Sequence, residues 1–110
     1  MKSVVITGAT GMIGYSLMEY LLQNGIKVTA ILRPNSYKRD IMPNHPLLSV
    51  YECSLSRLYT FKVPKDFHAD VFFHLGWDGT NGESRNDCYV QNDNIKYTLY
   101  AVDLARKMNC

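Results

Sequence analysis

The sequence predicts an α/β fold, a parallel sheet with helices on both faces. Short runs rich in Val and Ile alternate with longer helix-like stretches, and this alternation is typical of a parallel sheet covered by helices. A glycine-rich segment separates the first such run from the first helix-like stretch. The 110 residues suit one domain, and 46% of them are hydrophobic, which is enough to fill a core. We therefore expect a single domain over residues 1–110.

The first predicted unit is a strand followed by a helix. Ser3–Thr7 is a compact run of Val and Ile that ends at a glycine, so it predicts a strand buried on both faces. Met12–Asn24 has the spacing of an amphipathic helix. Gly25 stands where a left-handed residue commonly ends a helix. The predicted apolar stripe of this helix contains Ile13, Leu17, Tyr20 and Leu21.

The second predicted strand is Lys27–Leu32. Pro34 ends it, because proline has no amide hydrogen for a ladder hydrogen bond. Ser36–Met42 is long enough for at most two helical turns before Pro43, since the residue before a proline disfavours the helical conformation. A third strand is predicted at Leu48–Cys53.

The remaining predicted elements are a crossover, a strand and a long helix. Ser54–Phe61 predicts a short helical or irregular crossover. Asp70–Leu75 predicts a fourth strand, because three apolar residues follow one another within it. Ser84–Met108 predicts a long amphipathic helix. The predicted apolar stripe of this helix contains Val90, Ile95, Thr98, Leu99, Val102 and Ala105.

Composition argues against several classes of function. The 12 basic and 10 acidic residues give a net charge of +2 and are spread along the chain, so we expect no nucleic-acid partner. The three cysteines form no Cys-x-x-Cys pair, so neither a disulfide framework nor a metal site is expected. No apolar run approaches the ~18 residues of a membrane span, and the N-terminal run is too short for a secretory signal. We therefore expect a cytoplasmic protein with no membrane partner.

The motif that says most about function is Thr-Gly-Ala-Thr-Gly-Met-Ile-Gly at residues 7–14. Gly8 allows a tight turn out of the strand, Gly11 lets the backbone approach a pyrophosphate, and Gly14 lets the helix pack closely. The free amides and the dipole at the helix start would then bind the phosphates. No lysine follows Gly14, so the loop of nucleoside-triphosphate-binding proteins is excluded. The plainer alternative is a glycine-rich turn without a ligand.

Arg33 follows the second strand, roughly 20 residues after Gly14, where the residue that reads the ribose of a dinucleotide is expected. A carboxylate there accepts hydrogen bonds from the 2′-hydroxyl of NAD, whereas the guanidinium of Arg33 suits the 2′-phosphate of NADP. The sequence therefore predicts that NADP is preferred to NAD. Lys38 and Arg39 are candidates for a second contact. The alternative for all three cations is a solvated basic face.

Three segments together resemble a known family. The spacing Thr-Gly-x-x-Gly-x-x-Gly is similar to the cofactor motif of the extended short-chain dehydrogenase/reductases, the NAD(P)-dependent epimerase/dehydratase family. Asp70–Trp77 resembles that family's Asp-x-Val-x-His-Leu-Ala-Ala, and Asn94–Thr98 resembles its Asn-Val-x-Gly-Thr. The resemblance covers the whole chain. It implies a Rossmann-type sheet with strand order 3-2-1-4 that binds NADP or NAD.

The resemblance also implies which residues bind the dinucleotide. Ser54 stands where the family usually has Asp near the adenine, and Gly76 and Trp77 replace two small residues on the nicotinamide side. Asn94 is implied to help position the active site. The implied cofactor-binding set is Thr7, Gly8, Thr10, Gly11, Met12, Ile13, Gly14, Arg33, Ser54, Leu55, Leu75, Gly76 and Trp77.

The fourth strand and the residues after it allow two interpretations each. We interpret His74, late in a buried strand, as a packed histidine with one hydrogen-bond partner rather than as a catalytic base. The polar residues 77–82 follow the strand's carboxyl end, where ligands bind in open α/β sheets. A substrate-side loop and a plain surface loop both remain open for them.

The family's catalytic Tyr-x-x-x-Lys is absent, because no tyrosine of this chain has a lysine four residues on. The fifth and sixth strands and the sugar-binding part are absent too. We therefore expect the cofactor-binding portion of a larger enzyme, truncated after the fourth helix, and the resemblance implies that the parent enzyme moves a hydride to and from a nucleotide sugar. The alternative is a non-catalytic, redox-sensing dinucleotide-binding module. The bare apolar edge of the Asp70–Leu75 strand predicts self-association.

Overall fold

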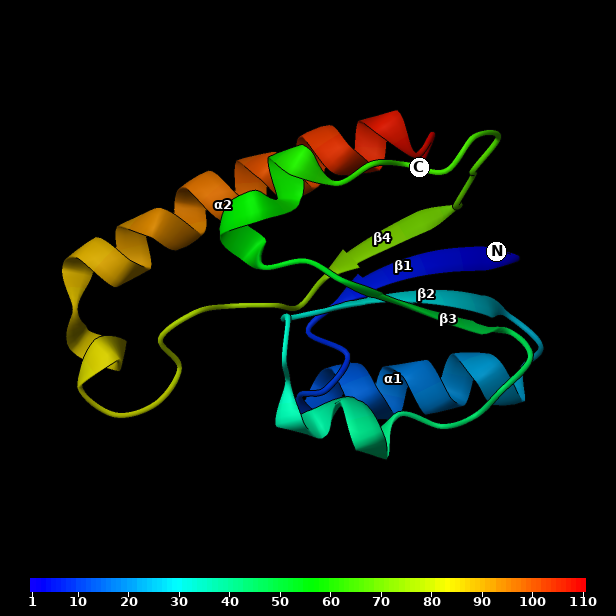
Figure 1. Ribbon diagram of the computed structural model, residues 1–110, viewed down its shortest axis with the longest axis horizontal. Helices are drawn as coiled ribbons and strands as arrows, with labels where there is room; N and C mark the ends of the chain where they lie inside the picture. Colours follow the sequence, from blue (N-terminus) through cyan, green and yellow to red (C-terminus); the bar gives the residue numbers. More distant parts are fainter.

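A parallel four-stranded sheet between two α-helices forms the fold (Figure 1). The computed structural model describes all residues, Met1–Cys110. The strand order β3-β2-β1-β4 confirms the predicted order 3-2-1-4 of a Rossmann-type α/β sheet. The strands are β1 (Ser3–Thr7), β2 (Lys27–Leu32), β3 (Leu48–Glu52) and β4 (Val71–His74). The helices are α1 (Met12–Gln23) and α2 (Cys88–Lys107), with short 3-10 helices η1 (Tyr37–Ile41), η2 (Leu55–Thr60) and η3 (Glu83–Asn86).

Strand β1 lies inside the sheet, and its register brings the carboxyl ends of its neighbours to one edge. Thr7, the last residue of β1, pairs with Ile31 of β2 and with His74 of β4. Val5 and Ile6 are completely buried, as expected for a parallel strand covered on both faces. The turn after β1 and the segment after β4 therefore start next to each other.

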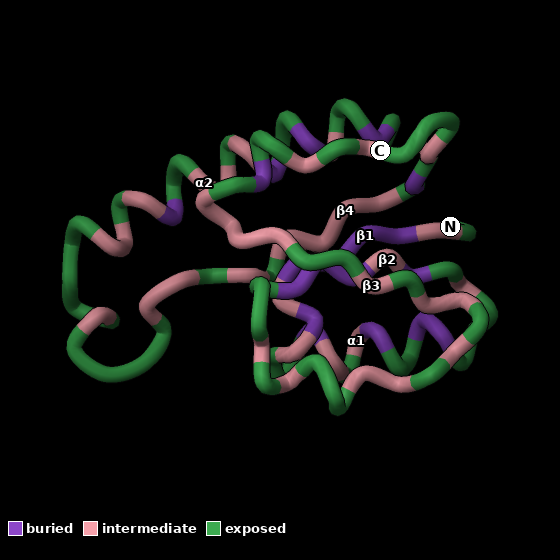
Figure 2. The backbone as a smooth tube through the Cα atoms, viewed as in Figure 1, coloured by how far each residue is buried: buried purple, intermediate pink, exposed green.

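The two α-helices cover opposite faces of the sheet (Figures 1 and 2). Alternate residues of β1 point to opposite faces, as the period of a strand requires. Val4 and Ile6 belong to the core cluster that contains α1, whereas Val5 belongs to the cluster that contains α2 and η2. The prediction of helices on both faces is confirmed.

The last helix starts later than predicted. Glu83–Asn86 forms the separate turn η3, and α2 begins at Cys88. Asp87 sets this start, because its side chain accepts hydrogen bonds from the amides of Tyr89 and Val90. A side-chain cap of this kind satisfies amides that have no partner inside the helix.

Both helices bury a face beside the predicted apolar stripe, so the predicted stripes are partly wrong. In α1, Gly14 is buried and Ile13 is 71% exposed. In α2, Ala101 is buried and Leu99 is 61% exposed. Gly14 and Ala101 allow the helix backbone to approach its neighbour more closely than a large residue would, which favours their face in a close-packed core. The other exposed members of the predicted stripes are Tyr20, Ile95 and Val102.

The two short segments, predicted as at most two helical turns and as a helical or irregular crossover, are 3-10 turns. The turn η1 follows Ser36, whose hydroxyl accepts a hydrogen bond from the amide of Lys38, and it ends before Pro43. The turn η2 occupies most of the predicted crossover. Helix α1 ends at Gln23 and is followed by Gly25 with φ 73°, the predicted left-handed residue. None of the helices combines the length and the hydropathy that a membrane crossing needs.

Candidate functional site

The carboxyl edge of the sheet carries an open cleft of about 600 Å³. The turn after β1, the end of β2, the start of η1, the β3–η2 junction and the segment after β4 all line it. This is the edge at which open α/β sheets bind ligands. Most of the predicted cofactor-binding residues meet there, namely Gly8, Thr10, Gly11, Arg33, Ser54, Leu55, Leu75, Gly76 and Trp77.

Gly8 brings the β1 turn against the segment that follows β4. Its φ is 77°, in the left-handed region that favours glycine. A Cβ at Gly8 would lie 2.6 Å from the carbonyl carbon of Leu75 and 2.7 Å from the amide nitrogen of Gly76. Both neighbours are backbone atoms, so only glycine fits this approach. The predicted role of Gly8 in a tight turn agrees with this geometry.

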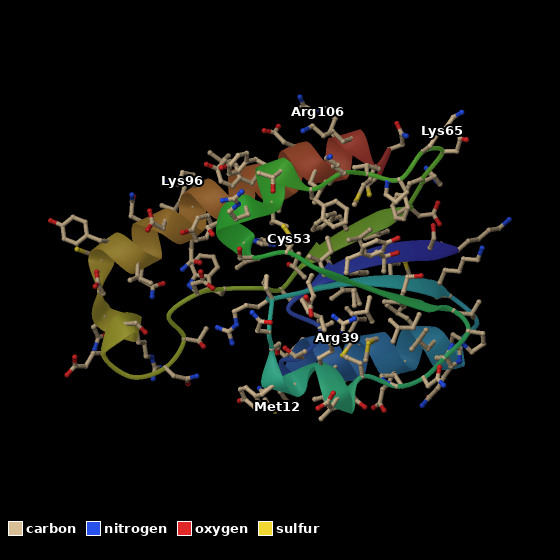
Figure 3. The ribbon with its side chains drawn as sticks, viewed as in Figure 1. Met12, Arg39, Cys53, Lys65, Lys96 and Arg106 are labelled. Atoms are coloured by element: carbon tan, nitrogen blue, oxygen red, sulfur yellow. The ribbon has the colours of Figure 1, made fainter.

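The start of α1 presents unpaired amides. Gly11 is the residue before the helix and provides no side-chain cap, and the first turn contains no acidic residue. The amides of Met12, Ile13 and Gly14 make no hydrogen bond within the protein. A helix start with free amides and no competing carboxylate favours an anion. The side chain of Met12 itself is 86% exposed at the outer end of α1 (Figure 3).

Gly14 and Gly11 have different surroundings. A Cβ at Gly14 would lie 2.2 Å from the carbonyl oxygen of Gly8, so the helix start and the turn are in direct backbone contact. A Cβ at Gly11 would meet only that same oxygen, at 3.4 Å, which is ordinary contact. Gly11 lines the cleft, whereas Gly14 is buried behind it.

Thr7 lies behind the cleft and joins β1 to the end of β4. Its hydroxyl accepts a hydrogen bond from the amide of Gly76 at 3.2 Å and lies 2.8 Å from Nδ1 of His74. Burial lowers the pKa of His74 and so favours the neutral imidazole, whose Nδ1 can accept a hydrogen bond from the hydroxyl of Thr7. The expected hydrogen-bond partner of His74 is therefore Thr7, and the pair holds Gly76 at the cleft.

Cations gather at the β2 side of the cleft. Arg33 lines it, is exposed and makes no ion pair. Lys38 also lines the cleft, with Nζ 5.8 Å from the ring centre of Tyr37. Arg39 pairs instead with Glu52 of β3 and does not line the cleft. Of the three candidate cations, Arg33 and Lys38 remain free to meet an anion.

Asn94 contacts the loop after β4 and does not line the cleft. It is 1% exposed, its Oδ1 accepts a hydrogen bond from the amide of Asp78 at 2.9 Å, and its Nδ2 donates one to the Asp78 carbonyl at 2.8 Å. Asn94 therefore supports the wall of the cleft from behind. The residues of this loop that line the cleft are Trp77, Asp78, Gly79, Thr80, Asn81 and Ser84.

Sequence reasoning missed some lining residues and one supporting residue. Ser36, Tyr37 and Cys53 line the cleft beside residues that were predicted. Cys53 lies where β3 leads toward η2 (Figure 3). Gln91 of α2 binds the loop after β4. The signal that could have found Gln91 is its position three residues before Asn94, because residues at that spacing share one face of a helix.

Comparison with known proteins gives one family and several solved structures. The model of the NAD-dependent epimerase/dehydratase family matches residues 4–110. A search of curated proteins finds no match. The enzyme WbmH of Bordetella bronchiseptica, solved with NAD⁺, is 26% identical with a TM-score of 0.74, and the match covers 97% of this chain and 36% of WbmH. The UDP-N-acetylglucosamine 4-epimerase of Methanobrevibacter ruminantium M1, solved with UDP-N-acetylmuramic acid, is 27% identical with a TM-score of 0.74, covering 97% of this chain and 34% of that enzyme.

A UDP-galactose 4-epimerase has the same fold over this region. It is 24% identical with a TM-score of 0.75, and the match covers 96% of this chain and 34% of that enzyme. The present chain thus spans about a third of the length of the solved structures that it matches.

Proposed function

The chain belongs to the NAD-dependent epimerase/dehydratase family, and we propose that its cleft binds a nicotinamide dinucleotide. The observation that carries this proposal is the start of α1, where three amides without partners face no acidic residue and Gly11 leaves the backbone open to the cleft. These features suit the pyrophosphate of a dinucleotide. The solved structure of WbmH, which contains NAD⁺, supports the same class of cofactor.

The remaining lining residues suit the two ends of a dinucleotide. Arg33 lies at the β2 side, where the ribose of the adenosine half binds in folds of this class. Ser54 and Leu55 follow β3 on the same side and offer a hydroxyl and an apolar surface to the adenine. Leu75, Gly76 and Trp77 follow β4 and would contact the nicotinamide half. The dinucleotide would supply the hydride acceptor or donor.

The reaction proposed for the longer protein is hydride transfer to and from a carbon of a nucleotide sugar. The UDP-N-acetylglucosamine 4-epimerase of M. ruminantium, to which this chain is similar, supports that substrate class. Within the 110 residues, no tyrosine has a lysine four positions on. The part of the reaction that we assign to these residues is therefore binding and orientation of the cofactor.

The proposed compartment is the cytoplasm. Cys53, Cys88 and Cys110 are all free thiols. Free thiols, two of them exposed, suit a reducing compartment better than an oxidising one.

Calorimetric titration of the 110-residue protein with NADP and with NAD tests the binding. We expect heat of binding for at least one dinucleotide, and weak affinity, because contacts from the rest of a longer enzyme are lacking. ADP-ribose, which retains the pyrophosphate and adenosine, should also bind. Absence of binding by all three ligands, with a folded protein by circular dichroism, would falsify the proposal.

Arg33 is expected to make NADP the preferred dinucleotide. Its unpaired guanidinium would donate charge-assisted hydrogen bonds to the 2′-phosphate, a contribution of roughly 1.5 kcal/mol or about tenfold in affinity at an exposed site. Calorimetric titration of the wild type and of Arg33→Ala with NADP and with NAD measures this difference in affinity. Arg39→Ala is the matched control, because Arg39 already pairs with Glu52. Equal affinities for the two dinucleotides in the wild type would show that Arg33 does not read the ribose.

Self-association through β4 is also expected. Strand β4 pairs with β1 on one side only and forms an edge of the sheet within these 110 residues (Figure 1). An unpaired edge is a template for a strand of another copy. Light scattering over a concentration series should therefore show the average mass rising. Leu99→Lys, on the exposed side of α2, should leave this rise in place, and a protein that stays monomeric at high concentration contradicts the proposal.

A further inference from the structure

The carboxamide of Gln91, on α2, binds the loop after β4 at several points. Nε2 of Gln91 donates hydrogen bonds to the carbonyls of Gly79 at 3.0 Å and Ser84 at 3.2 Å. Oε1 of Gln91 accepts one from Nε1 of Trp77 at 2.7 Å. Gln91 thus joins the start, the middle and the end of the loop. Figure 1 shows this loop, in yellow, beyond the sheet and leading back to the start of α2.

The loop also lies too close to α2 for a side chain at Gly79. Gly79 has φ 73°, and a Cβ there would lie 2.7 Å from Cγ1 of Val90 and 3.1 Å from Nε2 of Gln91. One turn further along the helix, Asn94 makes two hydrogen bonds to the backbone of Asp78. All of these contacts join the loop to groups of the protein itself, so α2 supports the shape of the loop.

The contact with Gln91 decides which surface Trp77 presents to the cleft. The indole N–H is the only polar group of the side chain, and it is already donated to Gln91. Trp77 lines the cleft and is 48% exposed. What the side chain of Trp77 offers to a ligand is therefore apolar ring surface. An indole ring without this hydrogen bond could turn its N–H toward water or toward the ligand.

We propose that Gln91 is a positioning residue that orients Trp77 and holds the loop Trp77–Ser84 as a ready-formed wall of the dinucleotide cleft. This inference rests on the proposed function, because it names the dinucleotide as the ligand that meets the wall. Affinity should depend on Gln91 although Gln91 does not line the cleft. If a loop becomes ordered only when the ligand binds, the loss of conformational entropy lowers the affinity. A loop that the protein already holds in place avoids this cost.

The single tryptophan of the chain makes the test direct, since all tryptophan emission comes from Trp77. We would compare the wild type with Gln91→Leu, which removes the hydrogen bonds to Trp77, Gly79 and Ser84, and the longer one from Asn94 at 3.5 Å, at similar size. Asn92→Leu is the control, because Asn92 is an exposed neighbour on the same helix. Acrylamide quenching and emission anisotropy report the mobility of Trp77 without ligand. Calorimetry with NADP and thermal unfolding by circular dichroism complete the set.

Gln91→Leu should increase acrylamide quenching, lower the anisotropy and weaken NADP binding roughly three- to tenfold, the range expected for loss of a few partly exposed hydrogen bonds. Asn92→Leu should change none of these. Gln91→Glu keeps an acceptor for Trp77 but places a carboxylate oxygen against the two carbonyls, so it should weaken binding as Leu does.

Two outcomes overturn the proposal. One is Gln91→Leu with quenching, anisotropy and affinity like the wild type. The other is a lower unfolding temperature with no change in Trp77 mobility or affinity in the folded protein, which would make Gln91 merely structural. Failure of the wild type to bind any dinucleotide would refute the proposed function instead, and the ligand-free quenching arm would still decide whether Gln91 orients Trp77.

Discussion

Gly14→Ala should remove a large part of the stability of this protein. The added Cβ would lie 2.2 Å from the carbonyl oxygen of Gly8 and 2.9 Å from its carbonyl carbon, and both are backbone atoms. Overpacking typically costs 1–3 kcal/mol, and contact with backbone that cannot rotate away places this variant at about 3 kcal/mol or more. A domain is stable by only about 5–15 kcal/mol. Urea unfolding followed by circular dichroism measures the loss.

Gly11→Ala is the matched control in the same turn. Its φ is −76°, and its added Cβ would meet only the Gly8 oxygen, at 3.4 Å. We expect its free energy of unfolding to stay within about 1 kcal/mol of the wild type. Its dinucleotide affinity should fall, because the methyl group stands where the backbone would approach the pyrophosphate. Equal loss of stability in both variants would show that the Gly8 contact is not the cause.

Asn94→Leu is expected to cost about 2–3 kcal/mol, because it leaves a partly buried amide and carbonyl of Asp78 without partners. Leucine has the branched shape of asparagine and is larger, so the variant leaves no cavity, and the loss that we assign to the unpaired groups of Asp78 does not come from one. The dinucleotide affinity should fall as well, since Asp78 belongs to the wall of the cleft. Urea unfolding and calorimetry with NADP give the two values.

Asn92→Leu controls for asparagine replacement on the same helix, at an exposed position. It should change the free energy of unfolding by less than about 0.5 kcal/mol. If Asn94→Leu were equally mild, the two hydrogen bonds to Asp78 would contribute little to the folded protein, and the loop after β4 would be held by other contacts.

Much of the cleft could be predicted because its residues follow strand ends. Gly8, Arg33 and Ser54 each come just after a run of strand-forming residues, and parallel strands deliver such residues to one edge of a sheet. Thr7 and Asn94 were predicted as site residues too, but the structure places both outside the lining of the cleft. Their side chains form hydrogen bonds with neighbouring protein atoms. A local sequence pattern does not predict which hydrogen-bond partner a polar side chain has in the folded protein.

Local sequence determined the strands and the glycine turn, whereas the strand order followed from the resemblance to the family. Short apolar runs and a glycine at a left-handed position are properties of a few adjacent residues. The tertiary structure decided which face of α2 is buried. One apolar stripe contains Ile95 and Leu99, the other contains Ala101 and Leu104, and both satisfy the helical period. Only the second is buried, because Ala101 permits close packing on the sheet and Asn94, on the same side, finds both of its partners in a loop 16 residues away.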